Sequence, residues 1–143
     1  MQQVTRFGVY GVAIRDGKIL LITKKPQGCY PSMLDLPGGG IEFGETAEDT
    51  LRREFSEEVG MTFQKMHLLD NLSNCMKITH LEKPFLFHHV GQIYQVEEWE
   101  VMQHIQPEEI FSWYRLSDLN HDILTPLTRK ALHLPAIASA QKC

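Results

Sequence analysis

Glutamates at three positions of one predicted helix have the residue type and the spacing to hold a metal ion. At about 100° per residue, Glu54, Glu57 and Glu58 fall on one flank of the helix, and Glu58 falls within its apolar stripe. Like charges three and four residues apart repel, and a partly buried carboxylate without a partner is costly. A hard divalent cation removes both penalties, and Mg²⁺ prefers a few carboxylates together with substrate phosphates. Arg53, four residues before Glu57, is placed to pin that carboxylate by a charge-assisted pair.

The helix that carries these glutamates is expected at residues 47–59. Thr46 and Asp49 form a variant capping box, in which a hydroxyl and a carboxylate satisfy free amides of the first turn. Gly60 supplies the left-handed residue that ends the helix. The apolar positions share one stripe that is expected to face a sheet: Ala47, Leu51, Phe55 and Val59. Glutamates on a helix more commonly form a solvated face, which is the alternative for the trio and the explanation for Glu48.

The elements that must position this helix are mainly strands. Residues 3–14 and 18–23 are expected to form a hairpin, because Asp16-Gly17 suits a two-residue turn that needs positive φ at both positions. The rest of the chain is expected to form a loop, three strands and a closing helix, at residues 24–37, 64–73, 85–96, 110–116 and 126–134. This order predicts a single α/β domain over residues 1–143, with a mixed sheet.

The composition is that of an ordinary globular domain, with 143 residues, 43% hydrophobic and 22% charged. A net charge of −4 disfavours a nucleic-acid partner, since binding to a phosphate backbone usually requires a basic excess. Three cysteines without paired spacing, Cys29, Cys75 and Cys143, disfavour a secreted disulfide framework. Neither a signal peptide nor an apolar run of about 20 residues is recognisable, so we expect a cytoplasmic protein with no membrane partner.

The negative charge is concentrated in one segment. Residues 39–61 hold seven acidic and two basic residues, a net charge of −5, whereas the other 120 residues have a net charge of +1. Bound metal would largely neutralise such a carboxylate site and let an anionic substrate approach.

The same segment, GGIEFGETAEDTLRREFSEEVGM from Gly39 to Met61, resembles the Nudix box, and all seven of its fixed-identity positions match. Phe55 and Met61 stand where the family prefers Leu, Ile or Val. The preceding stretch Asp35-Leu36-Pro37-Gly38-Gly39 resembles the family's approach to the box, with Leu34 where Trp is common. The strands Ile19–Ile22 and Trp113–Leu116 fit as well, so the resemblance covers nearly the whole chain.

The resemblance implies a Nudix-type α/β/α sandwich, in which a mixed β-sheet is flanked by helices. It also implies hydrolysis of a nucleoside diphosphate linked to another group, with Mg²⁺ or possible Mn²⁺ as cofactor. By position, the metal ligands would be the three helix glutamates and the backbone carbonyl of Gly38, while Arg53 and Glu45 would orient those carboxylates. Gly39 and Gly40 would allow close approach of the backbone to metal and substrate phosphate.

The base that activates water varies within this family. One of the helix carboxylates can serve, and so can a glutamate on a loop before the late strand. Glu108 and Glu109 are the loop candidates, with Glu97 and Glu98 behind them. The alternative for each of these four residues is a solvated loop acid.

Substrate contacts are predicted at the end of the second strand and in the glycine loop. Lys24 and Lys25 are placed to meet phosphates, or else they are exposed lysines at a strand end. Tyr30, Phe43 and Trp113 are candidates for stacking on a base, although a Trp on a strand more often belongs to the core. His88 and His89 should point to opposite faces of one strand, so they are not expected to share a metal ion.

Subfamily marks for ADP-ribose, dinucleoside polyphosphate, coenzyme A and oxidised-purine substrates do not appear at their usual positions. Length and the upstream pattern look most MutT-like. The leading hypothesis is therefore hydrolysis of a nucleoside triphosphate to a monophosphate and pyrophosphate, by a monomer or homodimer. The alternatives are an ADP-ribose or nucleotide-sugar pyrophosphatase and, in another class, a non-catalytic nucleotide- or RNA-binding domain.

Overall fold

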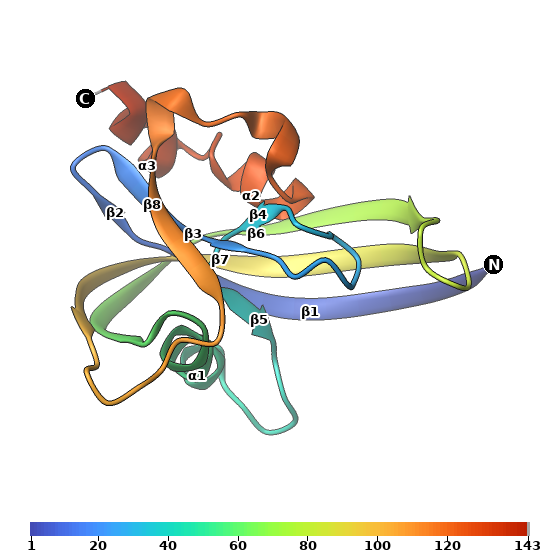
Figure 1. Cartoon of the computed structure of the whole chain (residues 1–143), viewed down its shortest axis with the longest axis horizontal. Helices are drawn as coiled ribbons and strands as arrows, with labels where there is room; N and C mark the ends of the chain where they lie inside the picture. The colour runs from blue at the N-terminus through green and yellow to red at the C-terminus, as the bar shows by residue number, and fades with distance from the viewer. Residues whose placement is uncertain (143) are drawn as a thin grey trace.

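Two four-stranded β-sheets cross in the middle of the molecule, with one long helix on one side and short C-terminal helices on the other (Figure 1). The computed structural model describes residues 1–142, and Cys143 lies outside the described residues. The strands of the first sheet, in spatial order, are β5 (Gly38–Gly40), β1 (Gln2–Val12), β7 (Phe85–Val101) and β6 (Met61–Ile78). Those of the second sheet are β2 (Ile14–Arg15), β3 (Lys18–Thr23), β4 (Leu34–Asp35) and β8 (Ile110–Arg115).

The helices form the outer layers of the fold. They are α1 (Ala47–Val59), α2 (Pro126–Ala131) and α3 (Pro135–Ala138), with the 3₁₀ helices η1 (Leu116–Asp118), η2 (His121–Ile123) and η3 (Ser139–Lys142). In the first sheet β1 runs parallel to β7 and antiparallel to β5, so the sheet is mixed. The predicted α/β/α sandwich with a mixed sheet is therefore confirmed. No helix among residues 1–142 is long and apolar enough to span a membrane.

The predicted N-terminal hairpin is correct at its turn and wrong in its first arm. Asp16 and Gly17 have φ of 54° and 74°, as a two-residue turn requires, and join β2 to β3. The chain changes sheets at Ala13, so β1 pairs with β7 over eleven positions instead of with β3. The turn is set locally, whereas the partner of β1 is set by residues about 80 positions away, which the local pattern does not reveal.

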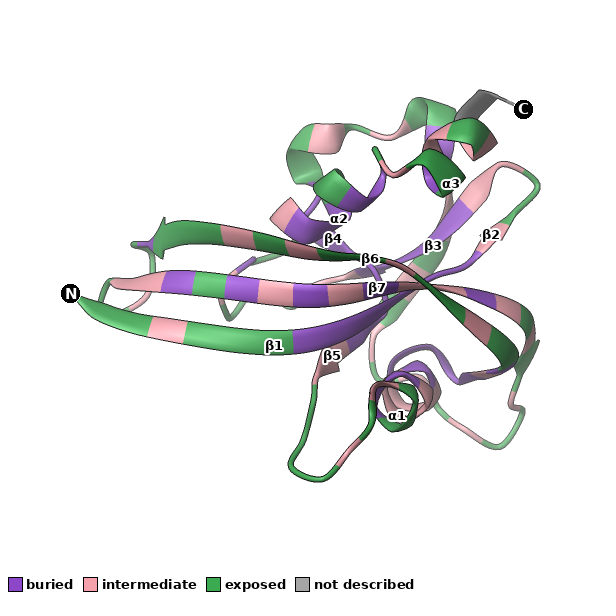
Figure 2. Ribbon diagram, turned by 180° about the vertical axis from the view of Figure 1, so that it is seen from behind, coloured by how far each residue is buried: buried purple, intermediate pink, exposed green. Residues whose placement is uncertain are grey.

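Two further strands and the closing helix also differ from their predicted bounds. The β6–β7 ladder runs from Met61↔Val101 to Ile78↔Phe85 and extends beyond both predicted segments. Much of β6 is exposed on both faces, as Figure 2 shows, so backbone pairing and not an apolar pattern defines its length. The helix predicted at 126–134 ends at Ala131, and a separate turn of helix begins at Pro135.

Two apolar clusters fill the space between sheets and helices. The cluster on the α1 side contains Leu51, Phe55 and Val59, which confirms the predicted stripe, while Ala47 is only half-buried. The cluster on the α2 side contains Ile93 of β7 and residues of α2. Because α1 packs against the crossing point of the sheets, its carboxylate flank lies beside β5.

Helix α1 has the predicted ends. Thr46 Oγ1 accepts from Asp49 N at 3.1 Å, and Asp49 Oδ2 accepts from Thr46 N at 3.0 Å, which completes the capping box. Gly60 has φ of 65°, and its N–H donates to the carbonyls of Phe55 and Ser56. The helix thus starts and stops at fixed positions, which sets the direction of its three glutamates.

Replacing Thr46 with Ala should lower the free energy of unfolding by about 1 kcal/mol, because Asp49 N loses its acceptor. Urea unfolding followed by circular dichroism measures this change. Thr46→Ser keeps the hydroxyl and serves as the control. Identical unfolding of the Thr46→Ala variant and the native protein would show that the capping box contributes no stability.

Candidate active site

Arg53 lies at the centre of the predicted site and joins several of its carboxylates. Its Nε and Nη2 donate to the two carboxylate oxygens of Glu45, at 2.8 and 3.0 Å. Its Nη1 donates to Glu54 Oε1 at 2.9 Å and to Glu57 Oε2 at 3.4 Å, the second being the pair expected from the sequence. Nη2 also donates to the carbonyl of Gly40 at 3.3 Å. One guanidinium therefore ties the loop before α1 to two carboxylates on α1.

Glu45 is held as a carboxylate by the groups around it. Hydrogen bonds from Arg53, from the backbone N–H of Glu42 and from the hydroxyl of Thr50 lower the pKa of Glu45 to about 2. The same contacts raise the pKa of Arg53 further above its ordinary value. Glu45 and Arg53 thus form an ion pair beside Glu54 and Glu57, and their role in orienting these carboxylates stays a prediction. Thr50 was not predicted, because a Thr in a helix gives no sign that it faces a carboxylate.

Glu58 is the most deeply placed of the three helix glutamates. It is buried, as its position in the apolar stripe predicted, and its Oε1 accepts from Gly38 N at 2.8 Å. Burial raises its pKa to about 9, against the lowering effect of the Gly38 hydrogen bond, and nearby Glu54 adds to the rise. Burial also raises the pKa of Glu54. Two neighbouring carboxyl groups are therefore unfavourable as anions unless a cation joins them.

The glycines beside these carboxylates leave no room for a side chain. A Cβ on Gly39 would lie 2.7 Å from Glu54 Oε1. Gly38 has φ of +145°, and a Cβ there would lie 2.1 Å from the carbonyl oxygen of Val9. The glycine strand β5 can therefore lie close to α1 and β1, while the predicted approach of Gly39 and Gly40 to metal and phosphate stays a prediction. The Gly38 contact that the structure records is its N–H on Glu58, and its carbonyl remains a predicted metal ligand.

The carboxylate oxygens of Glu54, Glu57 and Glu58 suit a hard divalent cation, although the three carboxylates do not converge on one point. Among residues 1–142, no group of three Asp, Glu, His or Cys side chains is arranged as a ready metal site. The bonds to Arg53 and Gly38 engage one oxygen each of Glu54, Glu57 and Glu58 and leave the other oxygen available. Oxygen donors and clustered negative charge suit Mg²⁺ or Mn²⁺ rather than a softer ion.

The loop glutamates are brought to the same helix through their backbone. The N–H groups of Glu108 and Glu109 donate to the carbonyls of Glu57 and Glu58, at 2.9 and 3.2 Å. The side chain of Glu109 lies 3.6 Å from Lys25 Nζ. Both loop residues therefore lie at the C-terminal end of α1.

Glu97 and Glu98 are placed differently. They belong to β7, where Glu98 forms an ion pair with Lys65 of β6 at 3.9 Å and Glu97 Oε2 lies 3.7 Å from His67 Nε2. Their contacts are therefore with the neighbouring strand and not with α1.

Lys24 lines two neighbouring pockets and lies near the carboxylates of Glu54 and Glu58. Its positive charge offsets a small part of the rise that burial causes in the pKa of Glu54 and of Glu58. The first, which we call the Asp35 pocket, has a volume of about 260 Å³ and is lined by Tyr10, Lys24, Tyr30, Asp35, Phe87 and His89 among others. The second, the Glu109 pocket, has a volume of about 350 Å³ and includes Lys24, Lys25, Glu108 and Glu109. Both predicted lysines thus lie where phosphates could reach them.

Similarity to known proteins agrees with this geometry. The family profile of the NUDIX domain matches residues 4–134. The chain belongs to the Nudix family. It is 30% identical over 117 residues to the 8-oxo-dGTP diphosphatase of Escherichia coli strain K12, covering 81% of this chain and 84% of that protein. It is 45% identical over 56 residues to the ADP-ribose pyrophosphatase of Methanocaldococcus jannaschii, covering 37% of this chain and 31% of that protein.

A solved structure with the same fold is the MutT Nudix hydrolase from Burkholderia pseudomallei. It has a TM-score of 0.74 and 28% sequence identity, and the match covers 92% of this chain and 98% of that one. The Nudix box of this chain therefore sits in a fold that is shared from end to end.

The aromatic residues proposed for stacking are found in three different settings. Tyr30 is buried and lines the Asp35 pocket of this Nudix domain. Phe43 is fully exposed on the loop before α1 and lines neither pocket. Trp113 packs against Trp99 with ring centroids 5.7 Å apart, and the Arg15 guanidinium lies 4.9 Å from its ring centroid, which agrees with the core interpretation.

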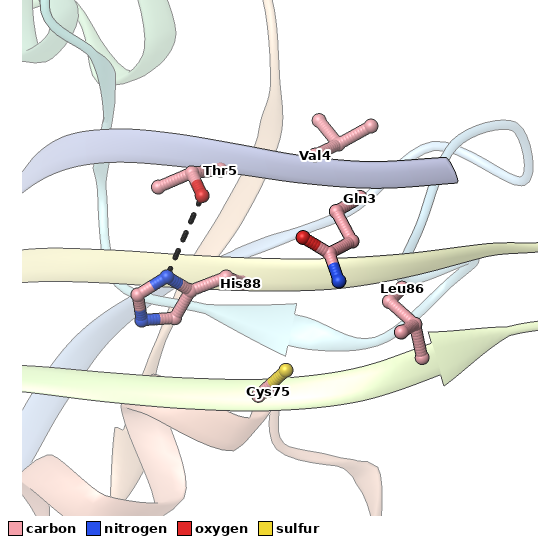
Figure 3. A pocket seen from close by; sticks show the side chains of 6 residues that line it. All are labelled: Gln3, Val4, Thr5, Cys75, Leu86 and His88. Carbon is pink, nitrogen blue, oxygen red and sulfur yellow. Dashed lines mark hydrogen bonds between the residues drawn. The ribbon is translucent and has the colours of Figure 1, made fainter. Parts of the chain in front are cut away.

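Most residues that line the Asp35 pocket, among them Tyr10, Asp35 and His89, were not predicted as site residues. A charged residue between the buried Leu34 and Leu36 was the available signal for Asp35, because such a residue needs partners. His89 was considered only with His88, and the two do lie on opposite faces of β7. Figure 3 shows His88 in a separate pocket that Thr5 and Cys75 also line, where its Nδ1 lies 3.5 Å from Thr5 Oγ1.

Replacing Arg53 with Lys should weaken binding of Mg²⁺ by about 10- to 100-fold, because one ammonium group cannot hold Glu45, Glu54 and Glu57 together. Isothermal titration with Mg²⁺ measures the change. Arg52→Lys, on the same helix with Glu48 as its partner, is the matched control. Equal Mg²⁺ affinity of Arg53→Lys and the control would contradict the orienting role of Arg53.

His89 predicts a pH dependence of stability. Burial lowers its pKa to about 4, below the ordinary 6.5, so between these values the unfolded chain takes up a proton that the folded protein does not. The contribution of His89 to stability is therefore complete above pH 6.5 and is lost as the pH falls toward 4. Thermal melts of the native protein and of His89→Gln at pH 7.5 and pH 5 should show a larger loss for the native protein. Equal losses would contradict the shifted pKa.

Proposed function

We propose that this chain is a Nudix pyrophosphohydrolase that converts a nucleoside triphosphate to a nucleoside monophosphate and pyrophosphate, with Mg²⁺ as cofactor and Mn²⁺ as a substitute. The observation that carries the proposal is the carboxylate set on α1, organised by Arg53 and placed beside Lys24 between two pockets. A triphosphate that crosses Lys24 has room for its nucleoside on one side and for its leaving phosphates on the other.

Glu54, Glu57 and Glu58 would hold the cation, with the carbonyl of Gly38 as a further expected ligand. When bound, the cation neutralises phosphate oxygens and makes the phosphorus more open to attack by water. The raised pKa of Glu58 fits this role, because a proton holds the place that the cation would take. Arg53 and Glu45 keep the ligands in position through the cycle.

The remaining chemical roles fall to Lys24 and to one glutamate. Lys24 would bind a phosphate oxygen, since its side chain lines both pockets. Lys25 forms an ion pair with Glu109 and lines the Glu109 pocket. The water-activating base is either a helix carboxylate or one of the loop pair Glu108 and Glu109. Glu57 is the more exposed helix carboxylate, at 43%, and is therefore accessible to water.

The two alternatives have less support. An ADP-ribose or nucleotide-sugar pyrophosphatase is favoured by the relative from Methanocaldococcus jannaschii, which aligns with only part of this chain, whereas the 8-oxo-dGTP diphosphatase aligns with most of it. A non-catalytic nucleotide- or RNA-binding domain has no need of three helix carboxylates, and all three are present here together with their orienting arginine.

The proposal predicts that nucleoside triphosphates give the highest kcat/KM in a panel with ADP-ribose, nucleotide sugars and dinucleoside polyphosphates, assayed with Mg²⁺. Glu57→Gln should lower kcat by about 100-fold or more if it is the base, because an amide cannot accept the proton of the attacking water. Glu108→Gln and Glu109→Gln test the loop pair in the same assay.

Glu48→Gln is the matched control on α1, since among residues 1–142 that exposed residue is paired with Arg52 alone. Unchanged hydrolysis by a Glu57→Gln/Glu58→Gln double variant would overturn the enzyme proposal. A higher kcat/KM for ADP-ribose than for any triphosphate would move the assignment to the first alternative.

A further inference from the structure

The Asp35 pocket contains a carboxylate that is nearly removed from solvent and only half engaged. Asp35 is 5% exposed, and its Oδ1 accepts from Leu36 N at 2.9 Å, Thr125 Oγ1 at 2.7 Å and Thr128 Oγ1 at 2.8 Å. These three donors saturate one oxygen and fix the plane of the carboxylate. The side chain is therefore held rigidly by groups that no ligand needs to displace.

The second oxygen of Asp35 has no such donors. Among the described residues, no fully buried polar side-chain atom lacks a hydrogen-bond partner, so Oδ2 must be reachable from the pocket that Asp35 lines. A carboxylate oxygen that is shielded from bulk water yet open to a pocket is a strong acceptor for a ligand N–H. The pocket thus presents one fixed acceptor.

A neutral hydroxyl donor lies in the same pocket, beside the cationic side chains of Arg6 and Lys24, which also line it. Tyr10 Oη lies 2.7 Å from His89 Nε2, and Tyr30 Oη lies 3.4 Å from His89 Nδ1. His89 is neutral at physiological pH and therefore has one N–H and one acceptor nitrogen. The two hydroxyls and the imidazole hold three protons, and the two hydrogen bonds use two of them. One tyrosine hydroxyl therefore always keeps a proton to donate.

The bond lengths indicate which tyrosine this is. The contact to Tyr10 is 2.7 Å long, whereas the contact to Tyr30, at 3.4 Å, is longer than a usual hydrogen bond, so the Tyr30 hydroxyl is the less engaged of the two. The proton of the Tyr30 hydroxyl remains free for a ligand. Tyr30 also lies against Phe87, with ring centroids 5.9 Å apart, so the donor stands beside an aromatic wall.

We propose that Asp35 and Tyr30 are specificity-determining residues that select a guanine-type base, a statement that rests on the proposed nucleotide hydrolase activity. The Watson–Crick edge of guanine carries two adjacent N–H donors beside a carbonyl oxygen. Asp35 Oδ2 takes the N–H donors, and the Tyr30 hydroxyl donates to the carbonyl. Adenine places an unprotonated ring nitrogen where guanine has N–H, so its lone pair would face the carboxylate. The aromatic wall favours a purine over the smaller pyrimidines.

The test is equilibrium binding of nucleoside monophosphates without metal, which does not depend on hydrolysis. GMP should bind at least about 10-fold more tightly than AMP, since a charge-assisted hydrogen bond separates them. IMP, which keeps the ring N–H and the carbonyl but lacks the amine, should fall between the two. Calorimetric titration of the full chain with each nucleotide gives the three dissociation constants.

Asp35→Asn keeps an oxygen for Leu36, Thr125 and Thr128 but puts an amide N–H in place of Oδ2, so the preference for GMP over AMP should disappear or reverse. Tyr30→Phe should weaken GMP and IMP but not AMP. Thr125→Val is the structural control, because it removes a donor to Oδ1 without touching Oδ2 and should leave the GMP/AMP ratio unchanged.

Equal binding of GMP and AMP by the native protein overturns the proposal, and so does the absence of binding by all three nucleotides. If Asp35→Asn and Thr125→Val change the GMP/AMP affinity ratio by the same factor, Asp35 has a structural role only and the proposal is overturned. If Asp35→Asn fails to fold, Tyr30→Phe and the comparison with IMP decide. A native protein that prefers GMP yet hydrolyses no triphosphate separates the two proposals, since the inference then holds and the proposed function fails.

Discussion

The buried charge on α1 is the constraint to which the rest of the active site is fitted. Glu54 and Glu58 lie close together in a partly desolvated place, where neither is stable as an isolated anion. Arg53 compensates part of this negative charge by pairing with Glu54, and Glu45 in turn forms a bidentate pair with Arg53. The uncompensated part of the negative charge is what the proposed divalent cation would neutralise.

Other features follow from the need to keep this charge in place. The capping box and Gly60 fix where α1 starts and stops, and the apolar stripe fixes its rotation against the sheets. The bare glycine strand β5 lets the backbone come within hydrogen-bond distance of Glu58. The chain crossing between sheets at Ala13 brings β1, and with it β5, to the side of the molecule where α1 packs. Stability and chemistry therefore share the same residues.

The parts that the sequence predicted well are those whose partners are near in sequence. The caps of α1 and the Arg53–Glu57 pair each join residues no more than five positions apart. What was missed depends on residues far apart. Asp35 finds its partners at Thr125 and Thr128, and β1 finds its neighbour in β7. Strand β6 was predicted too short because much of it is exposed and lacks the alternating apolar residues by which a strand is recognised in a sequence.

The same division of near and far partners separates the chemistry from the choice of substrate. The carboxylates of α1 and Arg53 lie in one continuous segment. The pocket beside it is assembled from β1, β4, β7 and the loop after β3, and none of its lining residues belongs to α1. Under the proposed base selection, single replacements at these dispersed positions would change the nucleotide that is accepted and leave the carboxylates of α1 in place.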